Sequence, residues 1–316
     1  MTLTLTQSTI KTWDRCKRKW WLGDYRRLTR DEYRSPLNVG NLVHEALEQY
    51  YLGAYGEDMP AFVDPITWIK DRSLAVMEEF PDDAAFIAKD ATMAGIMVEG
   101  YMEWLEETGA DAEIAKVEPE RMVSTQLRPG VKLLGKLDGK LEFHDGWVGF
   151  REDKTVQNFV ELPAIAQFDR QLLTYDLLEY LEHLNTIDSD GEKPSEPLTD
   201  GIILNMLRKV KRTATATPPF YMRHKVEHNL DELRNHWRHV VTISKQIEHA
   251  IVRLDADESH HNVVPPTPAT DCRWSCPFFE ICPMFDDGSD VEAVISFEYR
   301  EHDPLERYEL EAVDSE

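Results

Sequence analysis

Residues 135–154 read GKLDGKLEFHDGWVGFREDK, and this stretch decides the fold. Two β-type segments flank Asp145-Gly146, a dipeptide typical of tight turns, so the sequence predicts a hairpin. Asp138 lies on the first predicted strand, whereas Glu152 and Lys154 lie on the second. Carboxylates and lysine are poor strand formers, so their placement here calls for a chemical explanation.

Two acids and one lysine at the ends of adjacent strands are what a metal-dependent phosphodiesterase needs. Hydrolysis of a phosphodiester uses divalent ions that polarise the phosphoryl oxygen and generate hydroxide from water. Mg²⁺ and Mn²⁺ prefer carboxylate oxygens as ligands. A neighbouring lysine can orient the water or neutralise charge in the transition state. Surface charges on two exposed strands are the alternative interpretation of the same residues.

The segments around this hairpin predict an α/β fold. Residues 113–127 form a third predicted strand. A strong helix over residues 162–184 precedes a buried strand at 201–207, whose continuous apolar run indicates cover on both faces. Residues 60–110 have helical apolar spacing without visible chemistry, so we interpret them as a helical insertion.

The 316 residues, of which 42% are hydrophobic, are enough for one large domain. We expect a single domain over residues 1–285 and an acidic, partly mobile tail over 286–316. No run of about 18 apolar residues occurs, so we expect no membrane span. The N-terminus lacks a signal-peptide pattern, so we expect a cytoplasmic protein.

The net charge of −24 argues against a nucleic-acid enzyme, because phosphate binding usually requires a basic surface. Much of the acidic excess lies in residues 286–316, however. Two other segments, residues 15–27 and 208–225, are rich in arginine and lysine. We interpret both segments as candidate phosphate-contacting surfaces, with solvated basic residues as the alternative.

Four cysteines occupy two distant parts of the chain: Cys16, on a helix predicted over residues 7–22, and the cluster Cys272, Cys276 and Cys282 within residues 270–283. In an intracellular protein this spacing more often binds metal than forms disulfides. Four thiolates satisfy either a [4Fe–4S] cluster or a structural zinc ion. Two disulfides, or four buried and unconnected thiols, are also compatible with these positions. Either metal would form a clasp between the N- and C-terminal segments.

The ordered set of motifs resembles the PD-(D/E)XK nuclease superfamily, and within it the RecB-like and CRISPR-associated iron–sulfur exonucleases. The matching pieces are Gly40-(x)3-His44, Gly135-(x)2-Asp138, Glu152-Asp153-Lys154-Thr155, Gln171-(x)3-Tyr175, and the cysteines of CKRKWWL and CRWSCPFFEIC. The resemblance spans residues 8–283. Leu137 stands where the superfamily's name has proline, and the first two clustered cysteines have C-x3-C rather than C-x2-C spacing.

The resemblance implies a restriction-endonuclease-like core, in which helices flank a mixed central sheet. It implies that His44, Asp138 and Glu152 bind the catalytic Mg²⁺ or Mn²⁺, although a lone histidine on the amphipathic helix 38–51 would otherwise be interpreted as a core residue. Lys154 would activate or position the attacking water. Further residues would support the active site and the DNA strand, namely Gln171 and Tyr175.

The resemblance also implies that Cys16, Cys272, Cys276 and Cys282 hold a mainly structural [4Fe–4S] cluster, with zinc as the alternative. One residue of the ExK motif has no role assigned by it: Asp153, which should point opposite to Glu152 and Lys154 on a strand. Asp153 then either faces solvent or adds a third carboxylate to the site.

These features predict a metal-dependent DNA exonuclease of phage or prokaryotic origin that acts on single-stranded ends in recombination, repair or phage DNA processing. A non-catalytic DNA-binding or assembly subunit is one alternative, and a nuclease that processes CRISPR spacers is another. The chain contains no G-x-x-x-x-G-K-[ST] loop, so any unwinding would require a separate helicase or recombination protein. Ring-forming members of the family leave an oligomer open.

Overall fold

The computed structural model describes residues 2–33, 35–55, 62–186 and 197–308. The chain forms two compact units, and each is assembled from separate stretches of sequence. The central unit comprises Tyr33–Val123 and Lys136–Leu233, and the terminal unit comprises Met1–Glu32, Ser124–Gly135 and Arg234–Glu316. The domain boundary expected after residue 285 does not coincide with a boundary between the units.

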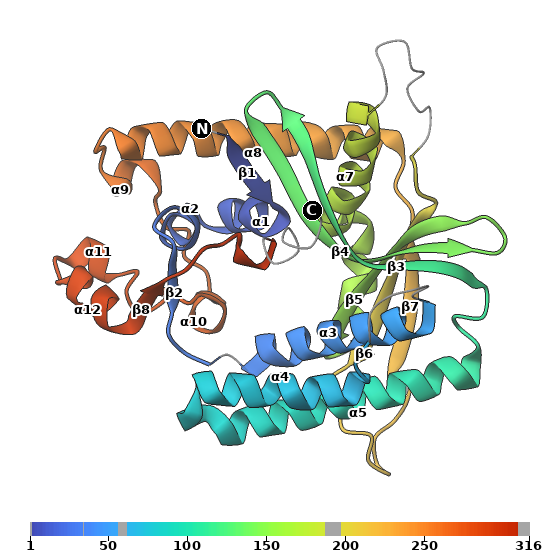
Figure 1. Cartoon of the computed structure of the whole chain (residues 1–316). Helices are drawn as coiled ribbons and strands as arrows, with labels where there is room; N and C mark the ends of the chain where they lie inside the picture. Colours follow the sequence, from blue (N-terminus) through green and yellow to red (C-terminus); the bar gives the residue numbers. More distant parts are fainter. Residues whose placement is uncertain (1, 34, 56–61, 187–196, 309–316) are drawn as a thin grey trace. The chain divides into compact units, whose positions relative to one another are not determined.

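The sheet of the central unit contains the predicted hairpin. Strand β4 (Val131–Phe143) pairs antiparallel with β5 (Val148–Val156) through residues 139–142. Strand β5 pairs parallel with β6 (Gly201–Arg208), which pairs antiparallel with β7 (Tyr221–Val226). A further strand, β3 (Ile114–Arg128), pairs with β4. Parallel and antiparallel pairs therefore coexist, and the prediction of a mixed sheet is confirmed (Figure 1).

Helices cover both faces of β5. Successive side chains of a strand point to opposite faces, and two neighbouring residues of β5 contact different helices. Arg151 lies over the ring of Tyr51 on α3 (Ser35–Tyr55). The neighbouring Glu152 instead accepts a hydrogen bond from Gln171 on α7 (Arg170–Thr186). Helix α7 also belongs to the connection between the parallel strands β5 and β6, which requires a long crossover.

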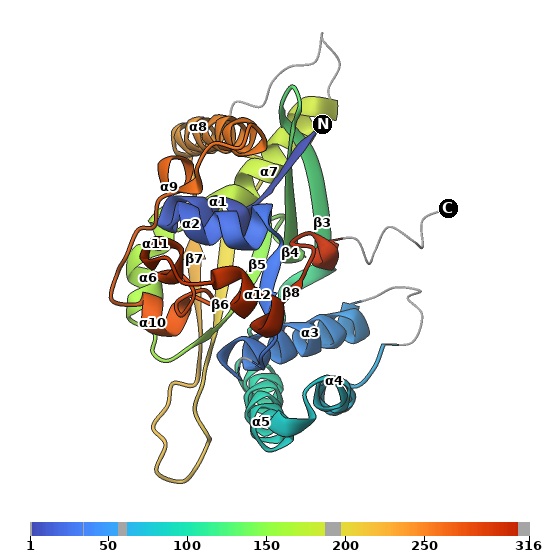
Figure 2. The same cartoon turned by 90° about the vertical axis from the view of Figure 1, so that its left-hand side faces the viewer.

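Helix α3 packs with α4 (Pro65–Glu79) and α5 (Ala84–Thr108), as Figures 1 and 2 show. Helix α4 begins after Asp64, whose carboxylate accepts hydrogen bonds from two backbone N–H groups of the first turn, and α5 ends at Gly109 in the left-handed conformation. Their shared core includes Leu42, Leu47, Met97 and Tyr101, all at most 1% exposed. Helical structure in the described part of residues 60–110 is confirmed.

Two predicted helices are interrupted. The helix expected over residues 7–22 is α1 (Gln7–Arg15) and α2 (Lys17–Trp20), separated by Cys16 in an extended conformation. The helix expected over 162–184 is α6 (Glu161–Ile165), a 3₁₀ turn (Ala166–Phe168) and α7. Asp169 is extended, and its carboxylate accepts a hydrogen bond from Gln171 N at 2.7 Å, so a new helix starts there.

The terminal unit contains the first and last described parts of the chain. Strand β1 (Leu3–Thr6) pairs parallel with residues 131–134 of β4, and β2 (Leu28–Arg30) pairs antiparallel with β8 (Tyr299–Glu301). The long predicted helix at residues 229–254 is confirmed as α8 (Leu230–Asp255), which crosses from the central unit into this one. Short helices follow: α9 (His260–Val263), α10 (Cys272–Ser275), α11 (Met284–Asp287) and α12 (Val291–Glu298).

The expected acidic tail is therefore structured over residues 291–301 as α12 and β8. Two acidic residues of this segment form ion pairs with arginines near the start of the chain. Arg26 pairs with Glu292 at 2.8 Å, and Arg30 contacts Glu298 and also Glu280, which precedes the segment. The last residues of the expected tail, 309–316, and most of the loop expected at 185–200 lie outside the described residues. Among the helices that the structure describes, none is long and apolar enough to cross a bilayer.

Candidate active site and cysteine cavity

His44 and Asp138 meet within the central unit. His44 lies on α3 and Asp138 on β4, and Nδ1 of the histidine is 3.3 Å from Oδ2 of the aspartate. Burial by itself lowers the pKa of His44, but the negative charge of Asp138 more than offsets this and raises the pKa to about 9. Burial conversely raises the pKa of Asp138, and the charge of His44 brings it well below its usual range. The pair is therefore an ionised carboxylate beside a cationic imidazole.

Glu152 and Lys154 form the second part of the site. They alternate along β5 and so point to the same face, where Lys154 Nζ donates to Glu152 Oε1. From α7, Gln171 Nε2 donates to Glu152 Oε1 at 2.7 Å, and Gln171 Oε1 accepts from Lys154 Nζ at 3.0 Å. Gln171 Nε2 is also 2.7 Å from the hydroxyl of Tyr175, one helical turn further on. The structure therefore brings these four predicted site residues together.

Glu152 is a buried carboxylate with only part of its hydrogen-bonding capacity used. Its side chain is 1% exposed, and Oε2 has no hydrogen-bond partner in the described part of the chain. Burial and the nearby charge of Asp138 raise the pKa of Glu152 to about 7, although Lys154 opposes this shift. The alternative interpretation of Glu152 as a surface charge is wrong. A buried carboxylate with an unpartnered oxygen is suited to bind a cation.

Asp153 is a buried carboxylate whose charge acts on His44, and it forms an ion pair of its own. It is 1% exposed, so it does not face solvent, and it points away from Glu152 and Lys154. Arg151 Nε donates to both of its carboxylate oxygens at 3.0–3.1 Å, and Asn205 Nδ2 donates at 2.7 Å. The backbone N–H of Asp153 donates to Asp138 Oδ2 at 2.8 Å. Asp153 thus belongs to a buried ion pair on the face of β5 opposite to Glu152 and Lys154.

The partners of this ion pair and one residue beside Lys154 were not expected from the sequence. Arg151 lies 3.6 Å from the ring centroid of Tyr51 and donates to the backbone carbonyl of Asp138. Asp169, at the start of α7, interacts electrostatically with Lys154. The alternation of side chains along β5 could have predicted that Arg151 shares a face with Asp153. Nothing in the nearby sequence could have predicted Tyr51 and Asn205, because they lie on distant elements.

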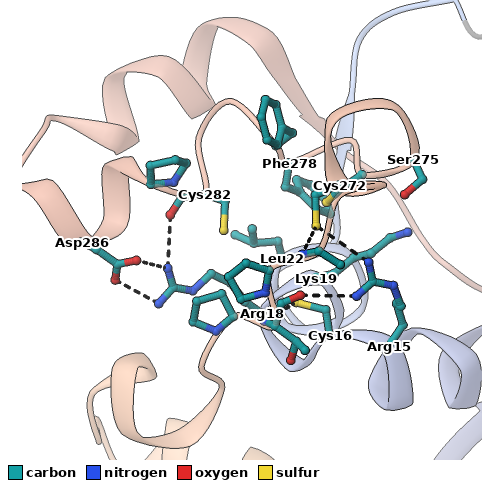
Figure 3. Close-up of a pocket in the computed structure, with 17 residues that line it drawn as sticks. Arg15, Cys16, Arg18, Lys19, Leu22, Cys272, Ser275, Phe278, Cys282 and Asp286 are labelled. Carbon is teal, nitrogen blue, oxygen red and sulfur yellow. Dashed lines mark hydrogen bonds and ion pairs between the residues drawn. The ribbon is translucent and has the colours of Figure 1, made fainter.

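The four cysteines also converge within the terminal unit, and Figure 3 shows Cys16, Cys272 and Cys282 around one cavity. They line a cavity of about 330 Å³ together with Arg15, Arg18 and Lys19. All four are free thiols, so the alternative of two disulfides is wrong. Backbone N–H groups of Thr267 and Ala269 donate to the sulfurs of Cys16 and Cys272 at 3.3 and 3.4 Å. Burial raises the pKa of the Cys276 and Cys282 thiols, which the positive charge of Arg18 partly counteracts at Cys282.

Neither group of side chains is arranged as a closed metal-ligand set. Within the described residues, no three or more His, Cys, Asp or Glu side chains stand in an arrangement that could hold a metal ion. In the central unit the potential ligands lie in two ion pairs, His44 with Asp138 and Glu152 with Lys154.

Arginines of the two basic segments mostly have intramolecular partners. Arg15 pairs with Asp271 at 2.5 Å, and Arg18, only 1% exposed, pairs with Asp286 at 2.7 Å. In the other segment, Arg212 pairs with Glu103, and Arg223 Nη2 lies 2.6 Å from Asp111. These contacts compensate charge within each unit, which weakens the interpretation of both segments as open phosphate-contacting surfaces.

The mixed sheet flanked by helices, with an acid–lysine pair on β5, is the arrangement of a PD-(D/E)XK nuclease. A model of the PD-(D/E)XK nuclease superfamily matches residues 4–283, and the chain belongs to this family, whose members are nucleases. No curated protein matches the sequence. Seventeen chains of solved structures match. One is the crystal structure of SSO0001, with 17% identity and a TM-score of 0.34, which covers 77% of this chain and 95% of that chain.

Proposed function

We propose that this protein is a metal-dependent exonuclease that hydrolyses DNA from single-stranded ends. The observation that carries the proposal is the convergence of four side chains in one unit: His44, Asp138, Glu152 and Lys154. Gln171 forms hydrogen bonds with both Glu152 and Lys154. In a nuclease family, this combination of carboxylates, histidine and lysine is suited to phosphodiester hydrolysis.

In this proposal His44, Asp138 and Glu152 hold Mg²⁺ or Mn²⁺. The carboxylates fit a hard cation, because Asp138 stays ionised and Glu152 keeps one buried oxygen without a partner among the described residues. His44 would join them as a ligand only after losing the proton that Asp138 stabilises on its imidazole. Lys154 and Gln171 both use the other oxygen, Oε1, so Glu152 can serve them and a cation together. A bound divalent ion supplies the charge that polarises a phosphoryl oxygen and activates water.

Lys154 positions the attacking water and stabilises the negative charge that develops on the phosphoryl group. Its ammonium group is kept protonated, because Glu152 and Asp138 outweigh the effect of burial and raise the pKa. Gln171 fixes the direction of the lysine side chain through a 3.0 Å hydrogen bond, and Tyr175 in turn holds Gln171. Gln171 and Tyr175 are therefore positioning residues in this proposal.

The experiment is cleavage of end-labelled single- and double-stranded DNA with Mg²⁺ or Mn²⁺. We expect Lys154→Ala to reduce the rate roughly 100- to 1,000-fold, the usual cost of removing a preorganised transition-state contact, while DNA binding persists. Lys116→Ala is the matched control, because Lys116 lies on β3 of the same unit and is 66% exposed. Equal rates for wild type and Lys154→Ala, or an inactive wild type with both metals, would contradict the proposal.

We also infer that the four cysteines hold a mainly structural [4Fe–4S] cluster, with zinc as the alternative. Four free thiols from distant segments share one cavity, and backbone N–H groups already donate to two of the sulfurs. Such N–H···S contacts are typical of thiolate ligands. Anaerobic purification, an absorption spectrum and an iron assay test this. A colourless protein containing zinc would exclude the cluster and leave the nuclease proposal intact.

A further inference from the structure

Three large apolar side chains are exposed on the connection between β5 and α7. Val160 is 75% exposed, Ile165 55% and Phe168 78%, all within nine consecutive residues. We call these three residues the apolar platform. Single exposed apolar residues are common on protein surfaces, whereas contiguous exposed apolar areas mark interaction sites. Three such side chains within nine residues make this connection a candidate for contact with a ligand.

The platform is held rigidly by the segment that carries it. Asn158 Oδ1 accepts hydrogen bonds from the backbone N–H groups of Val160 and Glu161, which starts α6. Ala166 is fully buried beneath the 3₁₀ turn. Gln167 Nε2 donates to the carbonyl of Glu227 and to Glu232 Oε1, both at 2.9 Å. A surface that is already fixed loses little conformational entropy when a ligand binds, so its apolar side chains are preorganised.

The platform also adjoins the candidate active site along the chain at both ends. It follows β5, which carries Glu152 and Lys154, and it precedes α7, which carries Gln171. Phe168 is directly followed by Asp169, whose carboxylate interacts with Lys154 and accepts from Gln171 N. Phe168 is therefore the immediate neighbour in sequence of a residue whose charge acts on the lysine. Arg170, also exposed, adds a positive charge next to it.

The geometry points to the apolar platform as the surface on which unpaired bases of the substrate strand stack, with Phe168 as the principal stacking residue; this inference rests on the proposed nuclease function. A strand whose phosphate reaches Lys154 must place its bases close by, and every base has a π-face that an exposed phenyl ring can cover. In a base-paired duplex these faces are already stacked. The platform therefore selects single-stranded ends over intact duplex.

The test compares Phe168→Ala, Phe168→Trp and Phe86→Ala. Phe86 is the matched control, since it is 61% exposed on α5 of the same unit. We expect Phe168→Ala to raise KM for a single-stranded oligonucleotide roughly 5- to 150-fold, the range for loss of one base–aromatic stack, with a smaller change in kcat. Phe168→Trp should restore KM, and Phe86→Ala should match wild type. Unchanged melting temperatures would show that the variants fold.

A spectroscopic measurement separates stacking from a general loss of binding. The probe is an oligonucleotide that carries 2-aminopurine near its end, and Lys154→Ala protein is used to prevent cleavage. Binding should lower the fluorescence at one position of the base. Adding Phe168→Ala to the Lys154→Ala protein should abolish that decrease. If wild type cleaves DNA but Phe168→Ala equals it in KM and fluorescence, the stacking inference is wrong, and a protein partner remains as the occupant. If wild type neither binds nor cleaves DNA, the proposed function itself fails.

Discussion

The candidate active site and the cysteine cavity both gather side chains that we propose as metal ligands, and they do so in different surroundings. At the candidate active site, opposite charges lie beside one another, His44 beside Asp138 and Lys154 beside Glu152. In the cysteine cavity, Cys16 and Cys272 accept hydrogen bonds from backbone N–H groups, and Cys272 also accepts one from Arg15. The four cysteines help to line a volume of about 330 Å³.

This difference teaches what each region needs from its ligand. Burying a carboxylate costs free energy unless a positive charge lies nearby. At the candidate active site His44 and Lys154 provide that charge. In the cysteine cavity the lining arginines Arg15 and Arg18 form their ion pairs with Asp271 and Asp286 and not with one of the thiols. Binding of a divalent ion at the first region therefore competes with protein cations, whereas a metal at the second replaces protons on the thiols.

The largest effect is expected from removing the negative charge of Glu152. Glu152→Gln keeps the shape of the side chain but loses the anionic oxygens, so Mn²⁺-dependent cleavage should fall about 1,000-fold or more, at the upper end for loss of one preorganised polar group. Glu142→Gln on β4 is the control, because the Glu142 side chain is 47% exposed and pairs with Lys116. Cleavage that survives Glu152→Gln at a tenth of the wild-type rate would remove Glu152 from the metal site.

The buried ion pair behind the site should dominate stability. Asp153→Ala leaves the guanidinium of Arg151 buried beside Tyr51 without its counterion, which costs about 3–5 kcal/mol when one partner of a buried pair is removed. Thermal unfolding followed by circular dichroism measures the loss. By contrast, Lys116→Ala breaks an exposed pair and should cost at most about 1 kcal/mol. Similar losses for the two variants would show that the Arg151 pair is not structurally important.

A weaker effect is expected from Gln171, which positions Lys154 without reacting itself. Gln171→Leu removes both hydrogen bonds to the acid–lysine pair, and loss of such a supporting contact typically lowers activity roughly 10- to 100-fold. The decrease should appear in kcat, and Tyr175→Phe, which removes only the hydroxyl that contacts Gln171, should cost less. A larger loss for Tyr175→Phe than for Gln171→Leu would overturn this order.

The smallest effect concerns a carboxylate of the terminal unit that lacks the compensation found at the active site. Thr9 Oγ1 donates to Asp24, and burial raises the pKa of Asp24 to about 6. The unfolded pKa is about 3.9, so the wild-type fold loses stability as the pH rises from about 4 to above 6. Asp24→Asn should therefore be more stable than wild type at pH 8, by at most about 3 kcal/mol, and nearly equal to it at pH 4. An equal gain at both pH values would contradict the assignment.

The sequence predicted those parts of the fold and site that depend on local pattern. Alternation and the Asp145-Gly146 turn predicted β4 and β5, and the order of weak motifs predicted which side chains meet at the acid–lysine pair. The helix breaks at Cys16 and Asp169 were not predictable, because the apolar spacing continues through both positions while a single extended residue interrupts the backbone.

Other features depend on contacts between distant residues. The burial of Asp153 requires Asn205, 52 positions further on, and Tyr51 beneath Arg151. The order of the last described residues depends on arginines near the start of the chain, among them Arg26 and Arg30. The expectation of an acidic, partly mobile tail over residues 286–316 rested on composition, which carries no information about those partners.

The discontinuous layout of the terminal unit has a consequence for translation. Cys16 and Cys282 are separated by 266 positions (282 − 16), which is roughly 13–53 s of synthesis at 5–20 residues per second. All residues of the central unit leave the ribosome before Cys272 is made. A nascent chain therefore carries every side chain of the hydrolytic site while three of its four cysteines do not yet exist. If the cysteines hold the proposed cluster, its assembly can begin only after the candidate active site has been synthesised.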